Sequence, residues 1–340
     1  MEWMTDLKWY ILNEAGYWSR RKAFRKCSYG DKNAHKKYRV LCNKDKFASA
    51  QGLLSTVAGI LPNIIEARLH GYIPVIDLCK NSRCQPMLQE RYLAKKENAW
   101  EYYFTQPDKG ITLEEVRKSK YVEVQIKSDA NLNYYIGDKR LQPDIRTRLL
   151  SNAVCKNIHL QPEIRSRVLR EKNLLFSQTD RVLGVGIRAG YRAGILRNLE
   201  MFNGHPFVGS CTDCIGEIEK RLKKWKYDSF FLAIDDREYL EEIKKYFGKD
   251  CIYLERPRVH YFQSAMQDMA QLSDDKKMVE FENISIRKKN EDYLIELYLL
   301  SQCESLYASR GTGHNFAYLL NAGRYSHVEF ENLGEFQYAK

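Results

Sequence analysis

The pattern of apolar and polar positions is most regular from residue 181 onward. Short apolar runs there alternate with longer segments in which apolar residues recur at helical spacing. The runs predict strands at 182–187, 228–235, 250–255, 305–309 and 326–330, and the segments predict helices around 212–225, 237–247, 286–304 and 313–321. Strands that alternate with helices in this way indicate a mostly parallel, doubly wound sheet.

The first half of the chain contains a similar strand–helix–strand unit over 38–78. Pro62 lies inside the predicted helix 53–69 and should kink or divide it, and Gly71 should end it. Residues 79–180 are less regular, with a strand predicted at 120–126 and charged helices at 142–150 and 161–175. The fold class predicted is therefore α/β, with domains at 38–175 and 176–340.

Residues 1–37 form a basic appendage in this scheme. Its aromatic residues Trp18 and Phe24 lie among many lysines and arginines. Two interpretations stay open: a solvated helix face against the first domain, or a segment that lies on an anionic membrane.

Composition narrows the class of partner. The 340 residues carry a formal net charge of +11, which favours anionic partners such as nucleotide phosphates. No known nucleic-acid-binding motif occurs, so we expect no nucleic acid partner. No apolar run reaches 18 residues, the first residues do not resemble a signal peptide, and the nine cysteines are scattered. We therefore expect a cytoplasmic protein, with peripheral membrane contact if the appendage supplies it.

Three loops with chemistry follow predicted strands. The first carries Arg188 and Arg192, the second Asp235 and Asp236, and the third runs from Ser309 through Gly311, Thr312 and Gly313. Ligands of open α/β sheets bind beyond the carboxyl ends of the strands. Arginine can donate two parallel hydrogen bonds to phosphate, and a Gly-rich helix start aims N–H groups at an anion. Each loop alone could be a tight turn, but together they predict a nucleotide-diphosphate site.

Two other patterns have a simpler interpretation. The aromatic residues of 97–107 suit sugar rings, but packing is the more common reason for such a cluster. Cys211 and Cys214 form one Cys-x-x-Cys pair, and a zinc site would need a second pair of ligands. We predict neither a metal nor a cofactor.

At this point the chain resembles the fucosyltransferase superfamily. The similar segments are 184–188, 231–236, 293–303 with Glu296, and 309–318, together with 41–44 and the helix start at 51–52. The family usually has His where Gly186 stands, and often Asp where Glu296 stands. The resemblance implies a GT-B architecture of two Rossmann-like domains across a cleft, a GDP-fucose donor, a glycan acceptor and inversion without a bound metal.

The resemblance also suggests roles for individual residues. Arg188 and the 311–313 loop would stabilise the leaving diphosphate, and Asp236 would orient guanine or ribose. Glu296 would brace Arg188 or the sugar. Glu200, whose spacing to His205 is similar to that of the presumed base in the α-1,6 enzymes, is the first candidate for the general base, and Asp213 is the second.

Two alternatives belong to other classes. A metal-dependent GT-A transferase would use an Asp-x-Asp motif, but Asp235 and Asp236 are adjacent. A non-enzymatic nucleotide- or nucleic-acid-binding protein would also fit the basic charge. Binding of nucleotide sugars would separate these possibilities.

Overall fold

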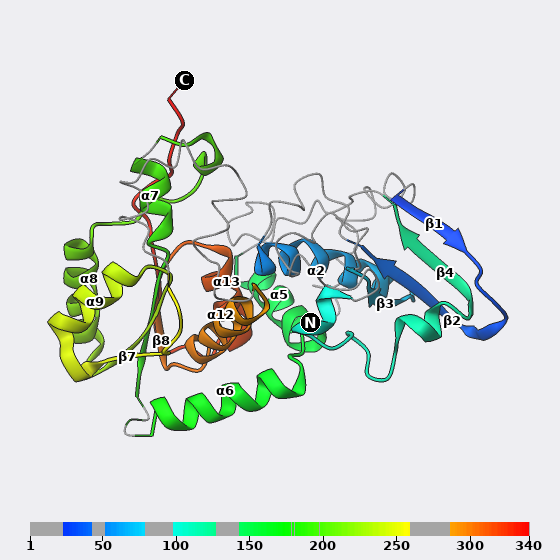
Figure 1. The fold of residues 1–340 in the computed structure, drawn as a ribbon, viewed down its shortest axis with the longest axis horizontal. Helices are drawn as coiled ribbons and strands as arrows, with labels where there is room; N and C mark the ends of the chain where they lie inside the picture. Colours follow the sequence, from blue (N-terminus) through cyan, green and yellow to red (C-terminus); the bar gives the residue numbers. More distant parts are fainter. Residues whose placement is uncertain are drawn as a thin grey trace. The chain divides into compact units, whose positions relative to one another are not determined.

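The computed structural model describes residues 23–42, 52–78, 98–126, 143–177, 179, 181–196, 198–258 and 286–339. The chain forms two compact units, Met1–Ile164 and Arg165–Lys340. Both are α/β, as predicted (Figure 1). The boundary between them lies about one helix earlier in the chain than the predicted boundary near 176.

The first unit is built on a four-stranded sheet in the order β1-β4-β2-β3. Its strands β2, β3 and β4 are parallel to one another, and β1 runs antiparallel to β4. The elements are β1 (Phe24–Cys27), β2 (Lys32–Leu41), α2 (Leu53–Leu69), β3 (Ile73–Ile76), η3 (Ala99–Tyr102), α4 (Leu113–Val116), β4 (Ser119–Gln125) and α5 (Pro143–Asn157). Strand β1 and the first residues of β2 fall within 1–37, the segment that was predicted to be an appendage. Both strands pair with β4, so this part of the segment belongs to the sheet of the first unit.

Helix α2 continues through Pro62, so the division that was one of the two outcomes expected from this proline does not occur. Ten of its residues are buried, and this apolar burial compensates for the hydrogen bond that proline cannot make. Gly71 follows the helix with φ +72°, the left-handed conformation expected of a residue that ends a helix.

Aromatic residues of 97–107 serve as core. Trp100, Tyr103 and Phe104 are all at most 1% exposed, and the Trp100 and Phe104 rings lie 4.6 Å apart. Packing therefore explains this cluster. The segment 43–51, which includes part of the family-like helix start, lies outside the described residues.

The second unit contains a five-stranded parallel sheet in the order β7-β6-β5-β8-β9. Its elements are α6 (Pro162–Leu175), β5 (Leu183–Ile187), α7 (Gly190–Leu196), η4 (Glu200–Phe202), α8 (Cys211–Trp225), β6 (Phe230–Ile234), α9 (Arg237–Phe247), η5 (Gly248–Asp250), β7 (Cys251–Tyr253), α12 (Ile286–Leu300), β8 (Ser305–Ser309), α13 (Thr312–Asn321) and β9 (Val328–Glu331). Every residue of β5, β6 and β8 is buried, as expected for parallel strands covered on both faces.

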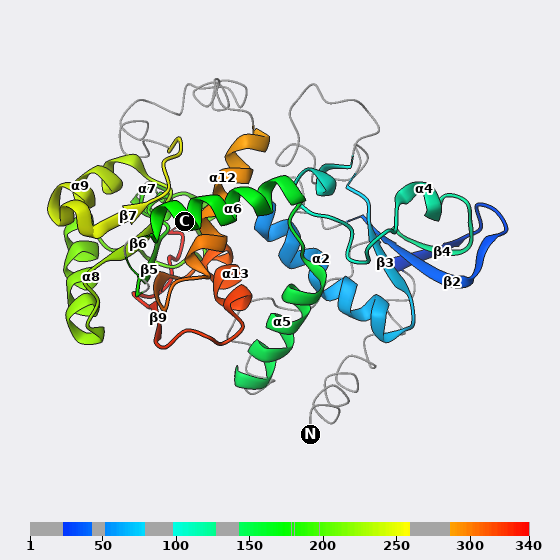
Figure 2. The same ribbon diagram turned by 90° about the horizontal axis from the view of Figure 1, so that it is seen from below.

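Helices cover the two faces of this sheet in pairs. Helices α8 and α9 lie on one side, and α12 and α13 on the other (Figure 2). Gly184 permits the close approach of α12, because a Cβ there would lie 2.8 Å from a methyl group of Leu300. No helix of the described ranges is long and apolar enough to cross a membrane.

Candidate functional site

The carboxyl ends of four parallel strands of the second unit lead into polar loops. Arg188 follows β5, Asp235 follows β6, the segment 254–258 follows β7, and Arg310 follows β8. Because these strands are parallel and adjacent, their loops meet at one edge of the sheet. This edge is the candidate functional site.

Arg188 and Asp235 form the ion pair at the centre of this edge. Nη1 of Arg188 lies 2.6 Å from Oδ2 of Asp235, and the N–H of Gly190 donates to Oδ1 at 3.3 Å. The Asp235 side chain is 10% exposed, whereas that of Arg188 is 36% exposed. Asp235 therefore fixes the guanidinium from inside, and the guanidinium keeps a face toward solvent.

Ser309 connects this pair to the Gly-rich loop. Its hydroxyl accepts the backbone N–H of Arg188 at 2.9 Å. Helix α13 then begins at Thr312, with Gly311 as its N-cap. The first N–H groups of a helix lack intrahelical partners and attract anions. Arg188, Asp235 and the 309–313 loop are thus brought together, as the sequence predicted.

Gly313 has a packing role that its place in the loop does not reveal. The hydroxyl of Tyr293 on α12 occupies the position that a Cβ at Gly313 would need. Gly311 is less restricted, since its Cβ would lie 3.9 Å from the Tyr191 hydroxyl. Glycine at 313 therefore lets α12 approach the first turn of α13.

His314 fills a space beside the strand that leads to Arg188. A Cβ at Gly186 would lie 2.8 Å from Cδ2 of the His314 ring. Nδ1 of His314 lies 2.7 Å from the carbonyl oxygen of Ser309, which can only accept, so Nδ1 carries the proton. Burial lowers the pKa of His314 and keeps it neutral. The His314 imidazole from α13 therefore fills the space that a side chain at 186 would need.

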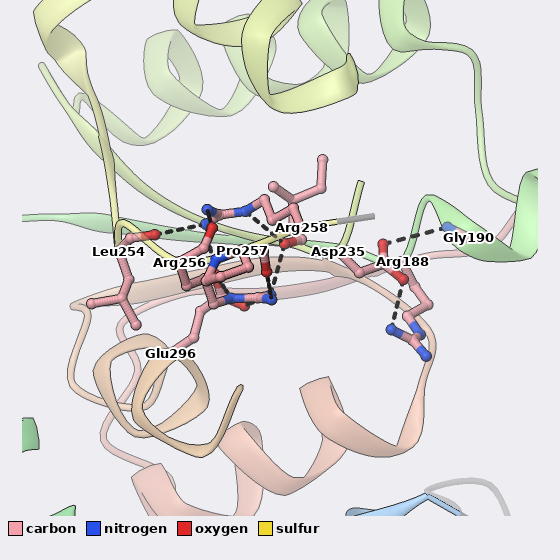
Figure 3. Close-up of polar contacts among 9 residues, drawn as sticks. Arg188, Gly190, Asp235, Leu254, Arg256, Pro257, Arg258 and Glu296 are labelled. Atoms are coloured by element: carbon pink, nitrogen blue, oxygen red, sulfur yellow. Dashed lines mark hydrogen bonds and ion pairs between the residues drawn. The ribbon is translucent and has the colours of Figure 1, made fainter. Parts of the chain in front are cut away.

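A second charged cluster, Arg256–Glu296–Arg258, lies beside the first (Figure 3). Arg256 binds both carboxylate oxygens of Glu296, at 3.1 and 2.6 Å, and Arg258 binds Oε1 at 3.1 Å. Both arginines also donate to the carbonyl oxygen of Ile234, the residue before Asp235. The cluster therefore holds the end of β6 in place.

This cluster corrects the predicted role of Glu296. Its carboxylate was expected to brace Arg188 or the sugar, but it is 1% exposed and neutralises one of two buried arginines. Burial and the neighbouring Arg256 lower the pKa of Arg258, against the attraction of Glu296. Two guanidinium groups on one carboxylate leave one positive charge at the strand ends.

Lys289 adds to the positive charge of this edge. It lies on α12 at helical spacing to Tyr293 and Glu296, so the three share one helix face. Its side chain keeps exposed surface, but the protein around it desolvates the ammonium group and lowers the pKa of Lys289 to about 8. The charges of Arg188 and Arg256 also lower the pKa of Lys289, whereas the charge of Asp235 raises it.

Two predicted carboxylates act as helix caps. Asp236 is fully buried and accepts the N–H of Tyr239 at 2.9 Å, which caps α9. Asp213 forms a capping box with Ser210 at the start of α8. Hydrogen bonds from Ser210 lower the pKa of Asp213, and the charge of Arg192 adds to this effect. Arg192 is therefore near the start of α8.

Glu200 is exposed and lies in η4, in the loop that follows α7. The loop is part of the same unit as Arg188, and the general base remains a prediction. Among the residues that the structure describes, no three side chains are grouped as ligands for a metal ion.

Several residues near the site were not predicted, although the sequence contains a signal for some of them. Arg256 and Arg258 follow a predicted strand, which is the same position that identified Arg188 and Asp235. Lys289 and Tyr293 precede Glu296 by seven and three residues on a predicted helix. His314 could not have been found in this way, because its position beside Gly186 depends on how α13 packs.

No family model matches this sequence, and no curated protein matches it. Among solved structures, the chain is similar to NodZ α-1,6-fucosyltransferase soaked with GDP-fucose, with 15% identity, a TM-score of 0.44, and coverage of 84% of this chain and 92% of NodZ. It is also similar to a FUT1 variant from Arabidopsis thaliana in complex with GDP, at 13% identity, a TM-score of 0.45 and coverage of 89% and 71%.

A third similar structure is POFUT1 in complex with GDP, at 8% identity, a TM-score of 0.47, and coverage of 87% of this chain and 98% of POFUT1. At these identities and TM-scores, the likeness carries no argument about activity.

Proposed function

We propose that this protein is an inverting glycosyltransferase that transfers fucose from GDP-fucose to a hydroxyl group of a glycan acceptor. The observation that carries the proposal is the convergence of Arg188, Asp235 and the start of α13 at one edge of a parallel sheet. The family-like segments of the sequence add the identity of the donor. The activity belongs to the biosynthesis of surface polysaccharide or oligosaccharide.

The chemistry requires positive charge where the sugar–phosphate bond breaks. The acceptor oxygen attacks the anomeric carbon, and the electron pair of the broken bond leaves with the diphosphate. Arg188 and the N–H groups at the start of α13 would stabilise this charge, and Lys289 is positioned to help. Asp235 and the Arg256–Glu296–Arg258 cluster would hold these groups still, which lowers the cost of reorganisation.

The remaining partners follow from the same proposal. The acceptor is a glycan, and the protein works in the cytoplasm. Residues 24–27 and 32–39 are in the first sheet, so packing explains that part of the basic segment. Residues 1–22 lie outside the described residues, and peripheral contact of this part with an anionic membrane remains an expectation.

Replacement of Arg188 tests the proposal directly. Arg188→Ala should lower the rate of transfer from GDP-fucose by roughly two to three orders of magnitude, or about 3–4 kcal/mol, because a leaving-group donor is lost. Arg188→Lys should also fail, since lysine has no bidentate fork. Arg181→Ala is the control, because that arginine is exposed and pairs with Glu304 beyond the other end of the strands. Transfer by Arg188→Ala at the wild-type rate would refute the assignment.

Transfer should continue in EDTA. Arginine, lysine and backbone N–H groups supply the charge that a metal would otherwise provide, so chelation should leave the steady-state rate within about twofold of the untreated enzyme. The measurement compares the untreated, EDTA-treated and manganese-restored enzyme. Loss in EDTA and recovery with manganese would instead support the metal-dependent GT-A mechanism, with Asp235 and Asp236 as ligands.

Two substitutions test the general base. Glu200→Gln should lower the transfer rate by roughly two or more orders of magnitude and leave GDP affinity nearly intact, because a base acts on the acceptor and not on the diphosphate. Asp213→Asn should change the rate much less, since Ser210 already binds that carboxylate. Its main effect should be a small loss of stability, because the capping box at the start of α8 is altered. The reverse ranking would assign the base to Asp213.

A further inference from the structure

A group of three aromatic rings begins beside Arg188, where the guanidinium contacts the ring of Tyr191. The guanidinium carbon of Arg188 is 5.5 Å from the centre of the Tyr191 ring, and the Tyr191 ring is 4.8 Å from that of His205. Phe202 completes the group, 5.4 Å from His205 and 6.3 Å from Tyr191. All three side chains are partly exposed. We call Tyr191, Phe202 and His205 the aromatic platform.

His205 carries an unsatisfied polar atom. Its Nδ1 is buried, and within the described ranges it has no hydrogen-bond partner. Burial and the nearby charge of Arg188 lower the pKa of His205, so the imidazole is neutral at physiological pH. A neutral imidazole offers one donor and one acceptor nitrogen. Buried polar atoms are nearly always satisfied, so the His205 ring has a hydrogen-bonding capacity that its neighbours do not meet.

A segment distant in sequence holds the loop that carries His205. The N–H of Gly204 donates to the carbonyl oxygen of Phe336 at 2.8 Å, and the N–H of Phe336 donates to that of His205 at 2.9 Å. The N–H of Phe207 donates to the carbonyl oxygen of Gly334 at 3.0 Å. We call residues 334–339 the strap.

Side chains strengthen this attachment. The N–H of Tyr338 donates to the side chain of Asn203 at 3.2 Å, and the Asn198 side chain donates to the carbonyl oxygen of Ala339 at 3.2 Å. Phe336 is 7% exposed, with its ring edge-on to that of Phe207. The strap thus fixes both ends of the loop 198–207, and a loop fixed in this way presents its side chains in a defined place.

Packing accounts for only part of the platform: Tyr191 packs against the core of the second unit, but its ring and those of Phe202 and His205 keep exposed surface. By contrast, Trp100, Tyr103 and Phe104 in the first unit are at most 1% exposed, and the Trp100 ring N–H donates to the carbonyl oxygen of Thr105 at 3.0 Å. The platform instead stays partly open, and the Tyr191 hydroxyl borders Gly311 at the start of α13. A group attached to a phosphate between Arg188 and the start of α13 would therefore lie close to the Tyr191 ring.

We propose that the aromatic platform is the subsite for a sugar ring, with the His205 imidazole hydrogen-bonding a sugar hydroxyl and with the strap holding the platform in place. The inference rests on the proposed function, in which a sugar follows the diphosphate. Flat aromatic faces with polar tips match the apolar face and the hydroxyl groups of a pyranose. The ring belongs either to the donor sugar or to the acceptor.

Substitution of His205 separates these two sources. His205→Ala should leave GDP affinity within twofold of wild type, because the phosphate contacts lie on Arg188 and α13. If the platform binds the donor sugar, the ratio of GDP-fucose to GDP affinity should fall at least fivefold. If it binds the acceptor, the acceptor KM should rise at least tenfold while that ratio is kept. An unchanged ratio together with an unchanged acceptor KM would overturn the proposal.

A matched control and a positioning variant sharpen the test. His327 also stacks on an aromatic ring, 5.2 Å from Trp225, but it lies at the amino end of the strands. His327→Ala should therefore change neither quantity. Phe336→Ala should change whichever of the two quantities, the affinity ratio or the acceptor KM, His205→Ala changes. Phe336→Tyr, which keeps the aromatic ring, should leave that quantity at its wild-type value. A lower melting temperature for Phe336→Ala with both quantities unchanged would show that the strap contributes stability alone.

Failure of the proposed function gives a different result. If wild-type protein neither binds GDP nor transfers a sugar, the glycosyltransferase assignment fails. The platform is then tested by binding of wild type and His205→Ala to an immobilised glycan panel. Loss of glycan binding in the variant alone would support the subsite, and an absence of binding by wild type would overturn it. His205→Asn, which keeps a polar side chain of smaller size, serves as the second variant if His205→Ala does not fold.

Discussion

The ion pair between Arg188 and Asp235 is the interaction on which the rest of the site depends. It joins the ends of two neighbouring strands, and its aspartate is nearly buried while its arginine faces solvent. A pair that is partly exposed contributes little to the free energy of unfolding, so its value is geometric. It holds one guanidinium at the sheet edge, where the dipole of α13 also favours an anion.

The buried cluster behind this pair has a different role. Arg256 and Arg258 share Glu296 and bind the last carbonyl of β6. Burial of ionised groups costs free energy that a hydrophobic core of the same volume would not incur. The cluster is therefore better explained by the positioning of the site than by a gain in folding stability. It fixes the strand end that presents Asp235, and it leaves one net positive charge near a site for an anion.

The sequence predicted the parts of this structure that depend on local pattern. Helix α9 and strand β8 were placed at their observed bounds, because an apolar run or stripe with polar flanks determines both ends. Helix α7 was missed, since its short segment after Arg188 has a Gly-rich composition typical of a turn. The three predicted loops meet as expected because parallel strands fix where their ends lie. Contacts between segments that are distant in sequence could not be predicted from local pattern. Glu296 binds an arginine forty residues away, and His314 fills the space at Gly186.

The central claim is that this edge of the sheet binds a guanine nucleotide diphosphate. A thermal-shift screen of wild-type protein against GDP, GDP-fucose, other GDP-sugars, UDP-sugars and CMP-sugars tests it most directly. A ligand that binds the folded state at one hundred times its Kd stabilises that state by about 2.7 kcal/mol, which is readily visible in the melting temperature. The account predicts a selective rise with GDP and GDP-fucose that increases with concentration. A rise with UDP-sugars alone, or no rise with any nucleotide, would contradict it.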